Sequence, residues 1–161
     1  MKNQYFGDVN DYLKYDLCIF LAENLSGISR LTFIPMLTAD DGSGDGEKTE
    51  YPLGVGREAL YRFLQDCADG DRRQVRSLRD YLTQERFSFA YSPYGDSLEL
   101  EFTHEDRDEY FARVPDELLQ DAVILVDPDT GHWADSTSRR TGHKYIKYEE
   151  AAGLHRRMSA R

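Results

Sequence analysis

Apolar residues recur at intervals of three and four along several stretches of the chain, which is the spacing typical of amphipathic helices. The first of these helices is predicted to begin after the capping residues Asp8 and Asn10 and to end near Gly27. Its predicted apolar face comprises Leu13, Leu17, Phe20, Leu21 and Leu25. Further helices are predicted over 57–67, 72–82, 105–119 and 148–158, the third of them interrupted at Val114 and Pro115.

Short apolar runs predict the strands. Residues 31–37 form one such run, and 122–126 form the clearest one, which places Asp127 at the carboxyl end of its strand. Segments 87–91 and 98–102 alternate with period two and predict a β-hairpin insertion, and a further short strand is expected at 144–147. Helices and strands in this order predict one Rossmann-like α/β domain over 1–161, with a mostly parallel sheet flanked by helices.

Two loops rich in carboxylates follow the predicted buried strands, namely 40–46 and 127–131. In open parallel sheets, ligands bind beyond the carboxyl ends of the strands, where the strand order reverses, so these loops are the candidate site. The carboxylates concerned are Asp40, Asp41, Asp127 and Asp129, and the first loop adds Gly42 and Gly44, which let a ligand approach the backbone. The structural alternatives are a solvated loop and a turn capped by aspartates.

The carboxylates of these loops limit the ligands that the loops could bind. Clustered negative charge repels a phosphate unless a divalent cation lies between them. The loops therefore indicate either a metal-bridged phosphate or a cationic ligand such as the amine of S-adenosylmethionine.

The composition is that of a folded and strongly acidic protein, with 40% hydrophobic residues, a net charge of −10 and a pI near 4.8. This charge argues against a general phosphate-binding surface, because nucleic-acid-binding proteins usually carry a basic face. Cys18 and Cys67 lie in apolar periodic segments and are expected to be small buried residues without a disulfide. No apolar run of about 18 residues and no signal-peptide core occur, so a cytoplasmic protein that does not enter the membrane is expected.

The segment Tyr5-Phe-Gly-Asp-Val-Asn-Asp-Tyr-Leu-Lys-Tyr15 resembles the opening of bacterial adenine-N6 methyltransferases of large-subunit ribosomal RNA. Gly7, Asp11, Leu13 and Lys14 stand at matching spacing. Residues 31–46 look like the first strand and cofactor loop of that Rossmann-like family, and Val126-Asp-Pro-Asp129 looks like its catalytic Asp-Pro-Pro-Tyr. A group of uncharacterised bacterial and phage proteins is closer still, with Gly-Asp-Val, Asp-Tyr and Lys-Tyr near the start and Asp-Pro-Asp later.

The resemblance implies that S-adenosylmethionine is the cofactor, held by Asp11, Asp40, Asp41, Gly42 and Gly44, and that Asp127, Asp129 and Lys14 are catalytic. Two departures stand against it. Asp129 replaces the second proline, and Thr130 replaces the aromatic residue that stacks on the target adenine in the resembled enzymes. The chain also reads as shortened at its C-terminus, which predicts an open sheet edge that needs a protein partner or a homodimer to cover it.

Three functions remain open from the sequence. The first is a methyltransferase-related protein that acts on nucleic acid or a nucleotide. The second is a nuclease or phosphoesterase that depends on Mg²⁺ or Mn²⁺, with Asp40, Asp41, Asp127 and Asp129 as ligands and Lys14 or Lys144 stabilising charge on the phosphate. The third is a non-catalytic acidic binding or inhibitor protein of phage or bacterial origin, which covers a basic partner.

Overall fold

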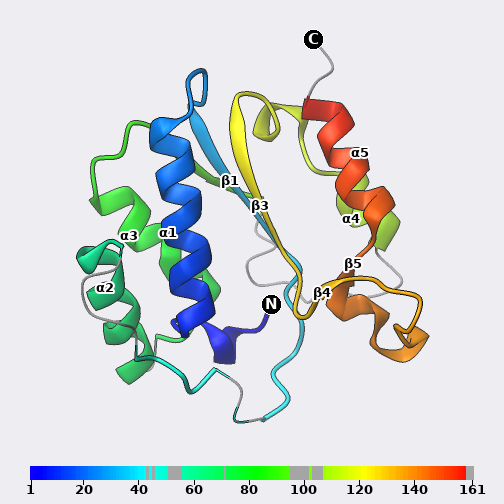
Figure 1. The fold of residues 1–161 in the computed structure, drawn as a ribbon, viewed down its shortest axis with the longest axis horizontal. Coiled ribbons are helices and arrows are strands. Elements are labelled where there is room, and N and C mark those ends of the chain that lie inside the picture. The colour runs from blue at the N-terminus through cyan, green and yellow to red at the C-terminus, as the bar shows by residue number, and fades with distance from the viewer. Residues whose placement is uncertain are drawn as a thin grey trace.

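A three-stranded parallel sheet forms the centre of the protein (Figure 1). The computed structural model describes residues 1–42, 44, 46–50, 56–70, 72–94, 102 and 107–158. The strands are β1 (Arg30–Pro35), β2 (Ala90–Pro93) and β3 (Ala122–Asp127), in the order β2-β1-β3. Strand β1 pairs with both neighbours, and Pro35 is in register with Asp127 at the carboxyl end of β3. The predicted α/β class with a parallel sheet is confirmed.

Helices cover both faces of this sheet. On one face lie α1 (Val9–Asn24), α2 (Glu58–Asp69) and α3 (Leu78–Gln84), and on the other lie α4 (Arg107–Ala112) and α5 (Tyr148–Met158) (Figure 1). Because side chains alternate across a strand, β1 contributes to two cores. Leu31 and Phe33 pack in the core beneath α1, while Ile34 packs in the core beneath α5.

The first helix begins where it was predicted but presents a different face to the core. Asp8 caps it by accepting a 2.8 Å hydrogen bond from the backbone N–H of Asp11. The predicted buried residues Leu13, Leu17 and Phe20 are 53–56% exposed. The buried face instead comprises Asp11, Tyr12, Tyr15, Cys18, Ile19 and Ala22. The helix is apolar on both sides, so spacing alone did not fix its rotation.

Tyrosine rings decide that rotation. The ring of Tyr15 meets Phe33 of β1 edge to face, with ring centroids 6.1 Å apart, and the ring of Tyr12 meets Tyr61 of α2 at 6.3 Å. An aromatic side chain buries more area than a leucine does and gains further from this ring geometry. The Tyr12 and Tyr15 side of α1 therefore faces the core, and the leucines face outward.

Most other predicted elements are present. Helix α5 has the predicted bounds, the interruption at Val114 and Pro115 separates α4 from the 3-10 turn η4 (Asp116–Leu118), and Cys18 and Cys67 are buried and free. The helix predicted over 72–82 begins only at the 3-10 turn η2 (Val75–Ser77), which leads into α3. The first arm of the predicted hairpin is β2, which pairs parallel to β1, while 98–101 of the second arm lie outside the described residues.

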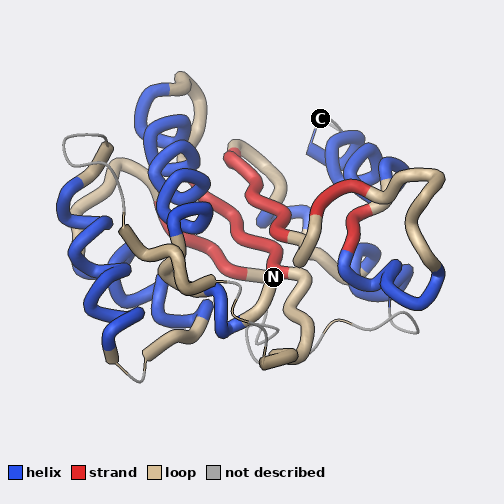
Figure 2. Tube along the Cα trace, turned by 60° about the horizontal axis from the view of Figure 1, so that its bottom comes forward, coloured by secondary structure: helices blue, strands red, loops and turns tan. Residues whose placement is uncertain are grey.

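The order of the strands defines a switch point. After β1 the chain passes through α2 and α3 to β2 on one side, then through α4 to β3 on the other side (Figures 1 and 2). The reversal therefore lies between β1 and β3, and both strands end at the same edge of the sheet. A small parallel pair, the unpredicted β4 (Gly131–His132) with β5 (Tyr145–Ile146), follows beside this edge. Within the described ranges, no helix is long and apolar enough to cross a membrane.

The two faces of α1 are expected to respond differently to truncation. Ile19 is fully buried, so Ile19→Ala should lower the free energy of unfolding by about 2–5 kcal/mol, because it leaves a cavity beneath the sheet. Leu17→Ala on the exposed face of the same helix should change it by less than about 1 kcal/mol. Urea unfolding of both variants tests the assignment, and a larger loss in Leu17→Ala would show that the leucine face is the buried one.

Candidate functional site

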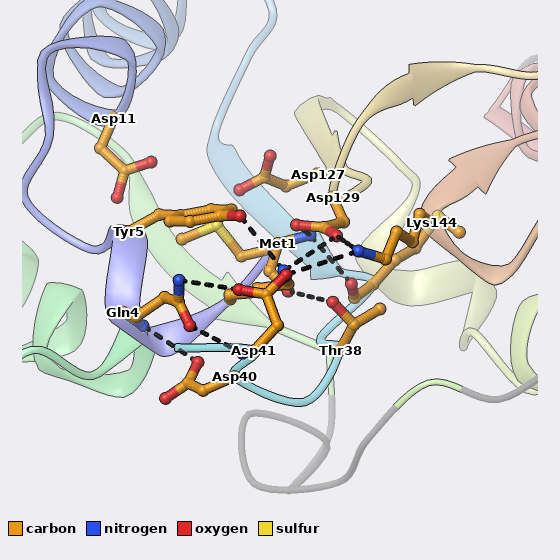
Figure 3. A network of polar contacts seen from close by, with 12 residues as sticks. Met1, Gln4, Tyr5, Asp11, Thr38, Asp40, Asp41, Asp127, Asp129 and Lys144 are labelled. Atoms are coloured by element: carbon orange, nitrogen blue, oxygen red, sulfur yellow. Dashed lines mark hydrogen bonds and ion pairs between the residues drawn. The ribbon is translucent and has the colours of Figure 1, made fainter. Parts of the chain in front are cut away.

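The two acidic loops converge on one cleft. Its volume is about 640 Å³, and it lies where β1, β3 and the start of α1 meet. Among its lining residues are Asp11 of α1, Asp41 after β1, Asp127 and Asp129 after β3, and Lys144 before β5 (Figure 3). Lys14 of α1 also lines the cleft. This volume is in the range of small-molecule sites, which is roughly 300–1,000 Å³. The cleft therefore lies at the switch point of the sheet.

Lys14 joins the start of α1 to the end of β3. Its Nζ lies 2.6 Å from Asp11 Oδ1 and 2.6 Å from Asp127 Oδ2. Asp11 and Asp127 are both buried, whereas the Lys14 side chain remains 23% exposed at the cleft. The ammonium thus neutralises two carboxylates that would otherwise repel each other across the cleft.

The backbone of Gly7 fixes the position of the Asp11 carboxylate. The backbone N–H of Gly7 donates to Asp11 Oδ2 at 3.1 Å. Gly7 has a φ of +88°, and a Cβ atom at this position would lie 2.8 Å from the backbone oxygen of Leu64. The close approach of α2 therefore requires glycine here, which gives a structural reason for the glycine that precedes Asp11 in the sequence.

Burial and neighbouring charges shift the pKa values of Asp11 and Lys14. Burial raises the pKa of Asp11 from 3.8 to about 6, and the negative charges of Asp127 and Asp8 act in the same direction, while Lys14 opposes them. Burial alone would lower the pKa of Lys14, but the carboxylates of Asp11 and Asp127 outweigh that effect and raise it. Lys14 is therefore charged at neutral pH, and Asp11 titrates close to neutrality.

Asp129 has the least exposed side chain of the four predicted loop carboxylates. Its side chain is 3% exposed, and its Oδ2 lies 3.4 Å from Lys144 Nζ and 3.8 Å from Lys2 Nζ. The amine of Met1 lies 3.7 Å from Oδ1, yet Oδ1 accepts no hydrogen bond from any described residue. A buried carboxylate oxygen in this state retains capacity to accept a donor.

The loop after β1 is fastened to the N-terminal segment. Gln4 donates from its backbone N–H to Asp40 Oδ1 and from Nε2 to Asp41 Oδ1, both at 3.1 Å, and its Oε1 accepts from the backbone N–H of Asp41 at 2.9 Å. The buried Lys2 ammonium also hydrogen-bonds Asp41 Oδ2 and donates to the Tyr5 hydroxyl at 3.1 Å. The side chain of Asp41 is thereby held at the cleft (Figure 3).

The predicted residues of this loop divide into two groups. Asp41 and Gly44 line the cleft, whereas Asp40 and Gly42 are exposed outside its lining. Ser43 and Asp45 of the same loop lie outside the described residues. The N-terminal contributors Lys2, Gln4 and Tyr5 were not predicted. The one signal near them was the resembled segment, which starts at Tyr5.

The four predicted metal ligands do not form a metal-binding group. Among the described residues, no three carboxylate, imidazole or thiol side chains are arranged to hold one ion. Lysine ammonium groups lie between the carboxylates, with Lys14 beside Asp127 and Lys144 beside Asp129. Each ammonium group occupies the position beside a carboxylate where a metal ion would lie, and it neutralises the negative charge that would bind the ion.

Negative charge still predominates in the cleft. Six carboxylates line its described part against three lysines, Lys14, Lys48 and Lys144. The Met1 amine adds little positive charge at neutral pH, because burial lowers its pKa to about 6 despite the nearby Asp127 and Asp129. A ligand that carries positive charge is therefore favoured over a phosphate.

Comparison with models of known protein families gives no match, and comparisons with curated proteins and with solved structures give no significant match either. Fold and site together define the class of this protein. It is an open Rossmann-like α/β protein with an acidic cleft at the switch point of its sheet.

Replacement of Asp11 by asparagine is expected to change how stability depends on pH. Because the pKa of Asp11 is raised in the folded protein, the folded state binds a proton more tightly than the unfolded chain, and ionisation of Asp11 costs folding free energy as pH rises. The free energy of unfolding of Asp11→Asn relative to wild type should therefore increase by on the order of 2 kcal/mol between about pH 4 and pH 7.

Urea unfolding at both pH values measures this difference. Asp66→Asn on the exposed face of α2 is the matched control and should show no such trend. A difference between Asp11→Asn and wild type that stays constant, or that decreases with rising pH, would contradict the raised pKa.

Proposed function

We propose that this protein is an S-adenosylmethionine-dependent methyltransferase or a close relative of one, acting on nucleic acid or a nucleotide. One observation carries the proposal: the loop after the central strand and the Asp127-Pro128-Asp129 turn after its neighbour meet in one cleft. In the resembled family, the cofactor loop and the catalytic Asp-Pro-Pro-Tyr segment are the corresponding elements. The strand order thus supports the resemblance to the adenine-N6 methyltransferases, which rested on three short segments of sequence.

The cleft suits S-adenosylmethionine in size and in charge. Its volume of about 640 Å³ is adequate for a nucleoside with an amino-acid tail. The sulfonium and ammonium groups of the cofactor are cationic, and the predominance of carboxylates in the cleft favours both. Gly44 and Gly46 line the cleft and carry no side chain to obstruct the ligand.

Asp127 is the residue that would orient the methyl acceptor. Lys14 contacts its Oδ2 at 2.6 Å and holds that oxygen in place. The other oxygen would accept the N–H or O–H of the acceptor, so that the acceptor lone pair points at the methyl carbon. Because methyl transfer is an in-line displacement, such positioning supplies most of the catalytic effect.

The phosphoesterase alternative gains no support from this geometry, since the carboxylates pair with lysines rather than with one another. The binding-protein alternative has one supporting observation. Leu13, Leu17 and Phe20 line an exposed groove on α1 together with Asp16, Gly56 and Arg57. Exposed apolar surface of this kind is typical of contacts with another protein. Such a contact is compatible with catalysis in the cleft, which lies at the start of the same helix.

Binding of S-adenosylmethionine tests the proposal directly. The cofactor should raise the thermal unfolding midpoint of the wild-type protein, because a ligand bound only by the folded state stabilises it by about 2.7 kcal/mol at 100 times its Kd. Asp41→Ala should remove most of this shift, since Asp41 lines the cleft. Asp40→Ala is the matched control, because Asp40 is the adjacent carboxylate and lies outside the lining.

Two results would contradict the proposal. A thermal shift with Mn²⁺ or Mg²⁺ and none with S-adenosylmethionine would favour phosphoryl chemistry. Equal loss of the cofactor shift in Asp40→Ala and Asp41→Ala would show that the cofactor does not occupy this cleft.

A further inference from the structure

Lys144 places an ammonium group between the two acidic loops. Its Nζ lies 3.4 Å from Asp129 Oδ2 and 3.8 Å from Asp41 Oδ2 (Figure 3). Its own backbone oxygen accepts the N–H of Thr130 at 2.8 Å, so the residue is anchored beside the turn after β3. Both ion-pair distances exceed the roughly 2.7–2.9 Å of a charge-assisted hydrogen bond, and the side chain is 28% exposed.

A second ammonium group reaches the same two carboxylates but is held much more tightly. Lys2 is 1% exposed, hydrogen-bonds Asp41 Oδ2, and lies 3.8 Å from Asp129 Oδ2. It also donates to the Tyr5 hydroxyl. Lys2 is therefore a fixed part of the fold, whereas Lys144 can move into solvent without breaking a short hydrogen bond.

Asp129 supplies an independent sign that this place accepts a ligand. Its carboxylate is 3% exposed, yet Oδ1 receives no hydrogen bond from any described residue. A buried oxygen that lacks a donor costs free energy, and this cost is relieved when a donor arrives. Lys144 contacts the other oxygen of the same carboxylate, Oδ2, at 3.4 Å, and both residues line the cleft.

We infer that Asp41 and Asp129 form a subsite for an ammonium group of the ligand, and that the Lys144 ammonium stands in for that group in the ligand-free protein. The recognised chemistry is a primary ammonium, which brings positive charge and up to three donors to the carboxylate oxygens. The subsite is defined by its own contacts, and its assignment to the amino group of S-adenosylmethionine rests on the proposed function. The ligand ammonium displaces Lys144 into solvent as it binds.

This exchange predicts that removal of a cleft lysine strengthens binding. Lys144→Ala should raise the affinity for S-adenosylhomocysteine by roughly two- to fivefold, since the ligand no longer competes with an exposed ion pair. Asp129→Asn should lower the same affinity by about tenfold or more, because a charge-assisted hydrogen bond is lost. Methylthioadenosine has the same nucleoside but no amino-acid tail, and its affinity should change in neither variant. Isothermal titration calorimetry measures all of these affinities.

Lys147→Ala is the matched control for the lysine. Lys147 lies three residues further along the chain over the ring of Trp133, outside the cleft lining, and its removal should leave both affinities unchanged. The unfolding midpoints of all variants are measured beforehand. If Asp129→Asn does not fold, Lys144→Ala still tests the subsite. Its expected effect is a higher affinity for S-adenosylhomocysteine, which a loss of structure cannot produce. Unchanged or weakened binding of S-adenosylhomocysteine in Lys144→Ala overturns the subsite.

The subsite and the proposed function can fail separately. If the wild-type protein binds neither S-adenosylhomocysteine nor methylthioadenosine, the cofactor assignment fails, and the subsite is tested with putrescine against neutral 1,4-butanediol by ligand-observed NMR. Stronger binding of putrescine in Lys144→Ala than in wild type supports the subsite alone. Absence of putrescine binding in both proteins overturns it, as does binding of inorganic phosphate that is lost in Lys144→Ala.

Discussion

The ion pairs of Lys14 with Asp11 and Asp127 are the interaction on which the site depends. They connect the first two turns of α1 to the last residue of β3, and Lys14 and Asp127 are 113 residues apart in the chain. Without the ammonium, two buried carboxylates would face each other across the cleft, and the unpaired charges would cost several kcal/mol. The start of α1 can approach the end of β3 because the Lys14 side chain neutralises the carboxylates of both Asp11 and Asp127.

The same interaction explains the rotation of α1. Asp11, Tyr15 and Cys18 lie on one side of the helix, and Lys14 borders that side. Once Lys14 reaches β3, this side must face the sheet, and Leu13 and Leu17 must face away from it. A polar contact at the helix start and the Tyr15 ring against Phe33 therefore select the same rotation. The exposed leucines are a consequence of how the cleft is built, and they leave an apolar groove on the outer side of α1.

The sequence was sufficient where one local signal dominated. The run of 122–126 has no helical periodicity and few alternatives to a buried strand, so β3 and the place of Asp127 could be predicted. The place of both acidic loops after buried strands could also be predicted. Their convergence could not be predicted, because it requires β1 and β3 to be neighbours in the sheet, and no local pattern specifies that pairing. The rotation of α1 could not, since leucines, tyrosines and a cysteine give it two apolar sides and only tertiary contacts choose between them. The roles of Lys2 and Gln4 depend on how the N-terminal segment packs against the Asp40 and Asp41 loop, which no local pattern encodes.

Lysines reduce the negative charge of an acidic cleft, but their positions here strengthen the case for a cationic ligand. A cleft lined by carboxylates without counter-ions would destabilise the fold in the absence of ligand. Lys14 and Lys2 relieve that repulsion permanently, because each hydrogen-bonds a carboxylate at close range. Lys144 relieves it only loosely, at longer distances and with more exposure. The charge that it supplies is the charge that a bound ligand would bring, so the ligand-free protein remains stable while the subsite stays available.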